Sequence, residues 1–193
     1  MYNNVIDIQK RIALGEETAL GNLHQLLNGK LVHFANALLK NKEAAEEIVE
    51  DVFVKIWCNR NKVMEIENLI VYLYVMVKNK SLNFLAAKTN NLLVAPFDFL
   101  DIELVDVNTQ PDDLLISAEM MLQMKSAIDN LPPRCKMIYK LIREDGLKYK
   151  EVAQILNISV NTIDVQMAVA VKRICVVLNL EKFSGSFSKI KKI

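Results

Sequence analysis

The sequence predicts an all-α fold: two small helical domains joined by an acidic linker, the C-terminal one containing a helix-turn-helix. Three observations support this fold class. Apolar residues recur at helical spacing along nearly the whole chain, and strand-like alternation is absent. Only five glycines and four prolines interrupt the 193 residues. The charge also changes in character along the chain, which indicates separate modules.

The charge distribution gives the expected domain limits. The net charge is +1, from 24 basic and 23 acidic side chains. Residues 1–88 hold 11 basic and 10 acidic side chains. Residues 89–117 hold 6 acidic side chains and no basic one, and residues 118–193 hold 13 basic and 7 acidic side chains. We therefore expect domains at 1–88 and 118–180, an acidic linker at 89–117 and a basic tail at 181–193. A basic module suits phosphate contact, although a lysine-rich solvated surface is the alternative.

The first half of the N-terminal domain is predicted to be helical throughout. Val5, Ile8 and Ile12 indicate a first helix that ends at Gly15. The apolar spacing then continues to Leu38 through Asn28-Gly29, which predicts two helices or one kinked helix. The stretch 43–57 has one apolar face, made of Ala45, Ile48, Val49, Val52, Phe53, Ile56 and Trp57.

The opposite face of the 43–57 helix is acidic and ends in Lys55. Acidic residues early in a helix interact favourably with the helix dipole. This structural role is enough to explain Glu43, Glu46 and Glu47 without a binding partner. Glu50 and Asp51 lie in mid-helix and gain little from it. They are the better candidates for a partner's basic surface, with a solvated face as the alternative.

A second helix of interest follows the loop 59–67, with Asn68 as its N-cap. Its predicted buried face is Leu69, Tyr72, Leu73, Met76, Val77 and Phe84. The second half of this helix places the amides of Asn79 and Asn83 and the ammonium groups of Lys78 and Lys80 beside aromatic residues. Amides that bond base edges, cations that meet phosphates and aromatics that stack are typical of single-strand recognition. Solvated side chains are again the alternative.

The C-terminal domain is predicted to hold four helices. One starts at Asp112 or Asp113 and ends before Pro132, and the next begins at Pro133 and ends at Gly146. A short helix then places Tyr149, Val152, Ala153 and Leu156 on one face, and Asn157-Ile158-Ser159 breaks it.

The last helix of the helix-turn-helix is predicted to run from Val160, with Ser159 as its N-cap. Its predicted buried face is Val160, Ile163, Met167, Ala170, Ile174 and Leu178. Its outer face carries Asn161, Thr162, Val165, Ala168, Val169 and Lys172. The residues nearest the N-terminus would meet base edges in a DNA-binding motif, whereas an ordinary helical hairpin would give them no such role.

Several classes of function are not expected. The three cysteines form no C-x-x-C pair and the two histidines have no ligand spacing, so we expect reduced thiols and no metal site. No Walker loop or catalytic triad appears, so we expect no enzyme, no catalytic residues and no cofactor. The longest apolar run, Leu69 to Val77, is nine residues, and no signal peptide is present. These features indicate a cytoplasmic protein with no direct membrane insertion.

Three stretches together resemble one known family. The run LPPRCKMIYKLIREDGLKYKEVAQILNISVNTI resembles region four of the extracytoplasmic-function group of bacterial RNA polymerase sigma factors. The run AAEEIVEDVFVKIW is similar to that group's region-two helix, and NLIVYLYVMVKNKSLNFL is similar to the helix after it. The three motifs occur in the right order and span nearly the whole chain. The sequence is therefore identified as a member of this group.

The resemblance implies a promoter-specificity subunit. Its partners would be core RNA polymerase, through the clamp of the largest subunit and the flap, promoter DNA, and an anti-sigma factor. The implied core-binding residues are Glu47, Glu50, Asp51 and Lys55. Those implied for the minus-ten element and its flipped bases are Tyr72, Lys78, Asn79, Lys80 and Asn83. Those implied for the minus-thirty-five element are Ser159, Asn161, Thr162, Val165, Gln166 and Lys172.

The chain departs from the family pattern at six positions. Glu47 and Glu50 stand where Asp and Gln are usual, a change that keeps the polarity of the helix face. Ala86 and Ala87 stand where Arg or Lys is common, and Asp164 and Val169 replace frequently basic residues of the recognition helix. We therefore expect modest affinity for the upstream element. The competing hypothesis is a free-standing helix-turn-helix regulator, which would bind duplex DNA alone.

Overall fold

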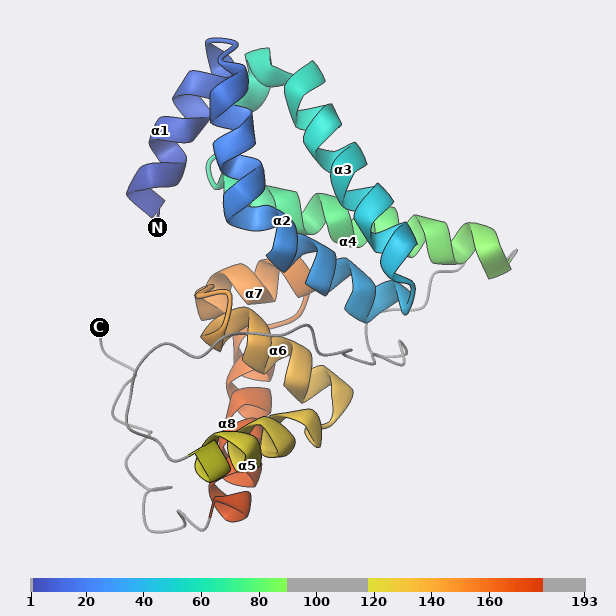
Figure 1. The fold of residues 1–193 in the computed structure, drawn as a ribbon, viewed down its shortest axis with the longest axis vertical. Helices are drawn as coiled ribbons and strands as arrows, with labels where there is room; N and C mark the ends of the chain where they lie inside the picture. Colours follow the sequence, from blue (N-terminus) through green and yellow to red (C-terminus); the bar gives the residue numbers. More distant parts are fainter. Residues whose placement is uncertain (1, 90–117, 179–193) are drawn as a thin grey trace. The chain divides into compact units, whose positions relative to one another are not determined.

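The computed structural model describes residues 2–89 and 118–178. The acidic linker, the basic tail and the predicted helix start at Asp112 or Asp113 lie outside these residues. Every extended regular element in the two described ranges is helical, which confirms the all-α fold. The chain divides into two compact units, one built on α1 to α4 and the other on α5 to α8 (Figure 1).

The first unit is organised around its second helix. It comprises α1 (Tyr2–Ala13), α2 (Glu17–Leu39), α3 (Lys42–Cys58), the 3-10 helix η1 (Arg60–Glu65) and α4 (Leu69–Thr89). Helix α2 packs against α1, α3 and α4. Gly15, with φ +84°, ends the α1 turn as expected. Asn28-Gly29 does not interrupt α2, which runs on to Lys40 in the left-handed conformation.

Helix α3 buries the face that its sequence predicts. Its N-cap is Asn41, whose Oδ1 accepts a hydrogen bond from the Ala44 N–H at 2.9 Å. The predicted apolar face is buried except for Trp57, which is half-buried. The guanidinium of Arg60 lies 5.0 Å from the Trp57 ring centroid, a cation–π contact at the end of the helix.

Helix α4 corrects the predicted buried face. Asn68 caps it as expected, with Oδ1 3.2 Å from the Val71 N–H. Tyr72, however, is 40% exposed, Phe84 is exposed and Met76 is half-buried. Ile70, Val71 and Tyr74 are buried in their place, and the Tyr74 ring meets Phe34 of α2 edge-on. Leu69, Leu73 and Val77 are buried as predicted, but the first half of α4 is apolar on all sides, so periodicity alone did not select the rest of the buried face.

The second unit comprises α5 (Ala118–Asp129), α6 (Pro133–Arg143), α7 (Tyr149–Leu156) and α8 (Val160–Val177). Helix α8 packs against α5 and α6. Pro133 begins α6, and Gly146, with φ +76°, follows its C-terminal end as expected. The predicted buried face of α8 is wrong at Val160, which is 43% exposed because it lies in the first turn, and Leu178 at the other end is only half-buried.

The three thiols differ in accessibility. All are free, with Cys58 exposed and Cys135 and Cys175 buried. Burial raises the pKa of the Cys135 thiol, opposed in part by Arg173 and Arg134.

We predict that Ellman's reagent modifies only Cys58 rapidly in the folded protein, because the thiolate is the reactive form and the other two thiols are covered. Cys135 and Cys175 should react in a later phase that follows unfolding in denaturant. Equal rates for all three thiols in the native protein would contradict this packing. A Cys58→Ser variant should lose the fast phase alone.

Candidate functional site

Capping interactions fix the limits of α7 and α8. The Lys148 N–H donates to Glu151 Oε2 at 2.8 Å, which satisfies the start of α7. Asn157, with φ +55°, adopts a left-handed conformation and ends that helix. Ser159 Oγ accepts a hydrogen bond from the Thr162 N–H at 3.0 Å and lies 2.8 Å from Thr162 Oγ1. The predicted helix-turn-helix is thus present, with Ser159 as its N-cap.

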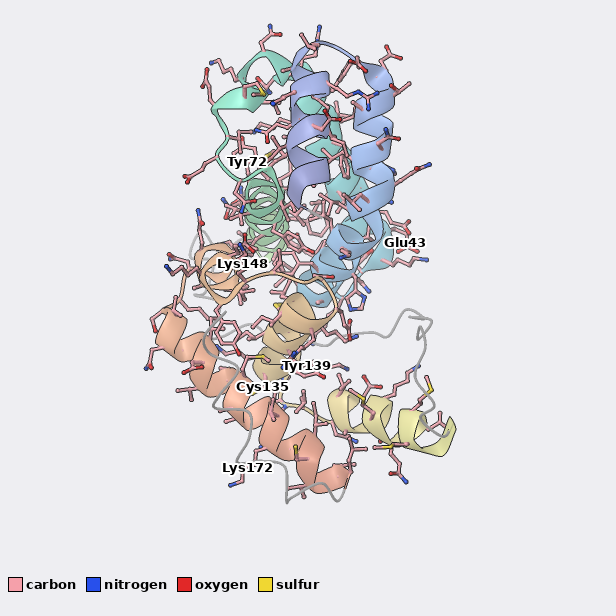
Figure 2. All side chains as sticks on the ribbon, turned by 90° about the vertical axis from the view of Figure 1, so that its left-hand side faces the viewer. Glu43, Tyr72, Cys135, Tyr139, Lys148 and Lys172 are labelled. Carbon is pink, nitrogen blue, oxygen red and sulfur yellow. The ribbon has the colours of Figure 1, made fainter. Side chains whose placement is uncertain are left out.

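The outer face of α8 holds the six residues implied for the upstream element, and three of them have internal partners. The hydroxyls of Ser159 and Thr162 are engaged with each other in the cap. Gln166 is half-buried, and its Oε1 accepts a hydrogen bond from the Cys135 thiol of α6. The structure leaves Asn161, Val165 and Lys172 exposed on this face, and Figure 2 shows Lys172 near the C-terminal end of α8.

The exposed face of α3 carries all four residues implied for core polymerase. Glu47, Glu50, Asp51 and Lys55 are solvent-accessible, as expected for a surface that meets a partner. Val54, which sequence reasoning missed as a surface residue, is 60% exposed on the same helix. The face therefore combines carboxylates with one apolar contact point.

Two of these carboxylates are held by neighbouring helices. Glu50 Oε1 lies 2.8 Å from His24 Nε2 of α2, and the imidazole packs against Phe53 with ring centroids 4.8 Å apart. Asp51 Oδ2 lies 2.7 Å from Lys80 Nζ of α4. The partners are 26 and 29 residues away in sequence, so no local pattern signals either pair.

Helix α4 presents a polar strip. Tyr72, Met76, Asn79 and Asn83 stand at i, i+4, i+7 and i+11, and such positions share one face of a helix. The tyrosine and both asparagines are exposed. At about 100° per residue, Lys78 and Lys80 leave the helix on opposite sides of this strip. The five residues implied for the minus-ten element therefore do not form one patch. Lys80 leaves α4 about 70° from the middle of the strip and lies beside it, whereas Lys78 leaves about 130° from the middle and lies off it.

A pocket opens at the start of the strip. It has a volume of about 390 Å³ and lies between the end of α3, η1 and the first turns of α4. Gln9 of α1, itself buried, fixes its loop by donating from Nε2 to the Val63 and Ile66 carbonyls at 2.7 and 2.8 Å. The lining residues are Lys55, Ile56, Asn59, Lys62, Val63, Glu65, Ile66, Tyr72 and Met76.

The pocket links residues that sequence reasoning assigned to different surfaces. Lys55, implied for polymerase, lies on the same pocket as Tyr72, implied for DNA. Sequence reasoning did not single out Asn59, the C-cap of α3, or Lys62 of η1, because this short stretch has no apolar periodicity to place them. Within residues 2–89 and 118–178, no group of three or more His, Cys, Asp or Glu side chains is arranged to hold a metal ion.

Comparison with known families accounts for both units. Residues 23–90 match sigma-70 region 2, and residues 121–174 match sigma-70 region 4. Together these matches cover more than half of the chain. The chain belongs to the sigma-70 family of RNA polymerase sigma factors. The match to region 2 contains the α3 face and the α4 strip, and the match to region 4 contains the helix-turn-helix.

Individual relatives place this sigma factor in the extracytoplasmic-function group. It is 22% identical over 166 residues to the ECF RNA polymerase sigma factor SigW of Bacillus subtilis, covering 80% of this chain and 86% of that protein. It is 21% identical over 160 residues to the ECF RNA polymerase sigma-E factor of Escherichia coli, and the alignment covers 80% of this chain and 83% of that protein.

A solved structure shows the same fold. The sigma factor RpoE of Bartonella quintana, crystallised with the anti-sigma factor NepR, aligns with a TM-score of 0.52 and 22% identity. The alignment covers 83% of this chain and 97% of that one. No helix in the described part of this sigma factor has the length and apolar character needed to cross a membrane.

We predict that Ser159→Ala lowers the free energy of unfolding by about 1 kcal/mol, because it leaves the Thr162 N–H without its cap. Urea unfolding followed by circular dichroism measures the loss. The control is Ser126→Ala at an exposed position of α5. Its hydroxyl caps no helix N-terminus and accepts only a long, exposed hydrogen bond of 3.4 Å from Asn130 Nδ2, so its loss should change stability by less than about 0.5 kcal/mol. Equal effects of the two substitutions would show that the cap contributes nothing particular.

Proposed function

We propose that this sigma factor binds core RNA polymerase through the exposed face of α3, and promoter DNA through α4 and α8. The observation that carries the proposal is the arrangement of the first unit, where α3 and α4 pack together and expose an acidic face and a polar strip respectively. The proposed plan has a region-two domain at 1–88, a linker at 89–117, a region-four domain at 118–180 and a tail at 181–193.

The α4 strip and its pocket suit the minus-ten element. An unstacked base enters the pocket and lies against Tyr72, while the amides of Asn79 and Asn83 meet base edges along the strip. Lys55 and Lys62 at the pocket supply charges for the backbone. We therefore assign Lys55 to DNA as well as to polymerase, and we leave Lys78 without a role.

The energetics require no catalytic step. Extruding a base from duplex DNA costs a few kcal/mol, and stacking on an aromatic side chain returns about 1–3 kcal/mol per base. Stacking on Tyr72 together with contacts in the pocket and along the strip can offset this cost for bases that open transiently, so no nucleotide hydrolysis is needed. In this proposal the protein has no enzymatic activity of its own.

The upstream element is read by a smaller set than the sequence implied. We assign direct contacts to Asn161, whose amide can bond a base edge, to Val165, which can pack on a thymine methyl, and to Lys172, which can meet a phosphate. Ser159 and Thr162 fix the start of α8, and Gln166 is held by Cys135.

The acidic face of α3 suits a basic surface of core polymerase, with Glu47 and Val54 at its centre. We propose the clamp of the largest subunit as the site for this face and the flap as the site for the second unit. An anti-sigma factor is a further proposed partner, by analogy with the complex of RpoE and NepR. Because core polymerase is cytoplasmic in bacteria, we propose the same location for this chain.

The proposal is tested by measuring DNA binding with and without core polymerase. Fluorescence anisotropy on promoter fragments should show tight binding only when the chain and core are both present, and Glu47→Gln should weaken core binding. High affinity of the chain alone for duplex DNA, as a symmetric dimer, would instead indicate a free-standing regulator.

Tyr72→Ala should reduce open-complex formation by about 5- to 150-fold, the equivalent of about 1–3 kcal/mol of stacking. Closed-complex binding should change little, because the base is still paired there. Permanganate footprinting measures the melted strand. Tyr72→Phe keeps the ring and is the matched control, which should retain most activity. A loss of the same size in closed binding would argue against the pocket.

Lys172→Ala and Val165→Ala should weaken upstream binding in different ways. Losing the Lys172 charge should lower affinity uniformly across sequences and reduce the slope of log K against log salt by about 0.9. Losing the Val165 methyls should change the preference at one base pair. Binding by the holoenzyme to a library of upstream sequences at several salt concentrations separates the two. A sequence-dependent effect of Lys172→Ala would show that it reads bases.

A further inference from the structure

One ion pair joins the two surfaces of the first unit. Lys80 Nζ of α4 lies 2.7 Å from Asp51 Oδ2 of α3, with side chains 33% and 61% exposed. Lys80 leaves α4 beside the strip of Tyr72, Asn79 and Asn83. Asp51 belongs to the acidic face of α3. Each partner is therefore also within reach of a ligand that approaches its own surface.

A DNA phosphate at α4 and a basic side chain of a protein partner at α3 can each compete with one member of the Lys80–Asp51 pair. A DNA phosphate and the Asp51 carboxylate can bind the same group, the Lys80 ammonium, which is a compact charge on a flexible side chain. A basic side chain of a protein partner and the Lys80 ammonium seek the same carboxylate. An anion at α4 and a cation at α3 can thus replace the internal pair together, whereas either one alone leaves a partner unsatisfied.

We propose that the Lys80–Asp51 ion pair couples the two surfaces, so that a basic partner on α3 releases Lys80 for a phosphate of single-stranded DNA. The inference rests on the proposed function, because it takes the α3 face as the polymerase site and the α4 strip as the DNA site. By linkage, DNA bound through Lys80 raises the affinity of α3 for its basic partner by the same factor.

The other pairs on α3 do not have this property. Glu50 is paired with His24 of α2, and Glu46 lies 3.7 Å from Lys42 of the same helix. Neither His24 nor Lys42 lies on α4, so their release adds no charge beside the DNA strip. Because the Lys80–Asp51 pair is solvent-exposed, we expect the coupling to be modest, up to about fivefold in affinity.

The experiment measures binding of the full chain to a fluorescein-labelled, mixed-sequence 20-nucleotide single strand at low salt. Asp51→Asn should raise affinity about two- to fivefold and increase the salt slope by about 0.7, the value for one more phosphate contact on a single strand. Lys80→Gln alone should change affinity little. In the double variant the gain should be lost.

The matched control is Glu43→Gln, which removes one negative charge from the same helix. Glu43 is exposed, forms no ion pair within the described part of the chain, and lies on the side of the first unit away from Tyr72 (Figure 2). Its substitution should raise affinity less than Asp51→Asn does, and the rise should persist in the Lys80→Gln background.

Three results would overturn the inference. They are equal gains from Asp51→Asn and Glu43→Gln, a gain from Asp51→Asn that persists with Lys80→Gln, and no DNA binding by any variant. Core polymerase provides a second measurement, in which Lys80→Gln should weaken DNA binding by the holoenzyme several-fold more than by the free chain. Equal effects in both, with core still bound, would refute the coupling alone, whereas failure to bind core would refute the proposed function.

Discussion

Burial of one face of α3 is the constraint on which the first unit depends. Ala45, Ile48, Val49, Val52, Phe53 and Ile56 are buried where α3 packs on α2 and α4, whereas Val54 faces outward. With 3.6 residues per turn, this packing leaves Glu47, Glu50 and Asp51 no position except the outer face. The same packing brings His24 and Lys80 within reach of that face. The acidic face proposed for polymerase, the pocket and the ion pair to α4 are all consequences of how α3 is buried.

Helix α8 depends on a different constraint: the backbone N–H groups of its first turn need hydrogen-bond acceptors. Ser159 and Thr162 are engaged in the N-cap, and Gln166 is held against α6, so polar side chains that could meet DNA instead fix the helix. Among its exposed positions, Asn161 and Val165 are neutral. In the proposed function, this composition favours modest affinity for duplex DNA and gives the first unit its role as a second contact surface.

Helix limits and caps could be predicted from the sequence because they depend on neighbouring residues. Asn68, Ser159, Pro133 and Gly146 all act where local rules place them. The buried face of α4 could not be predicted, since LIVYLYVMV is apolar on every side and packing on α2 decides which residues are covered. The pocket and the pairs of Asp51 and Glu50 join residues distant in sequence. Motif resemblance found the strip of Tyr72, Asn79 and Asn83, but only the geometry separated Lys78 from it.

The central claim is that this chain directs core polymerase to promoters through both units. Run-off transcription with purified core polymerase, with the chain added or omitted, tests it most directly on genomic promoter fragments. We expect transcripts with discrete 5′ ends that require the chain and disappear when either promoter element is replaced. Absence of any chain-dependent start site, with the protein folded and core active with another sigma factor, would contradict it.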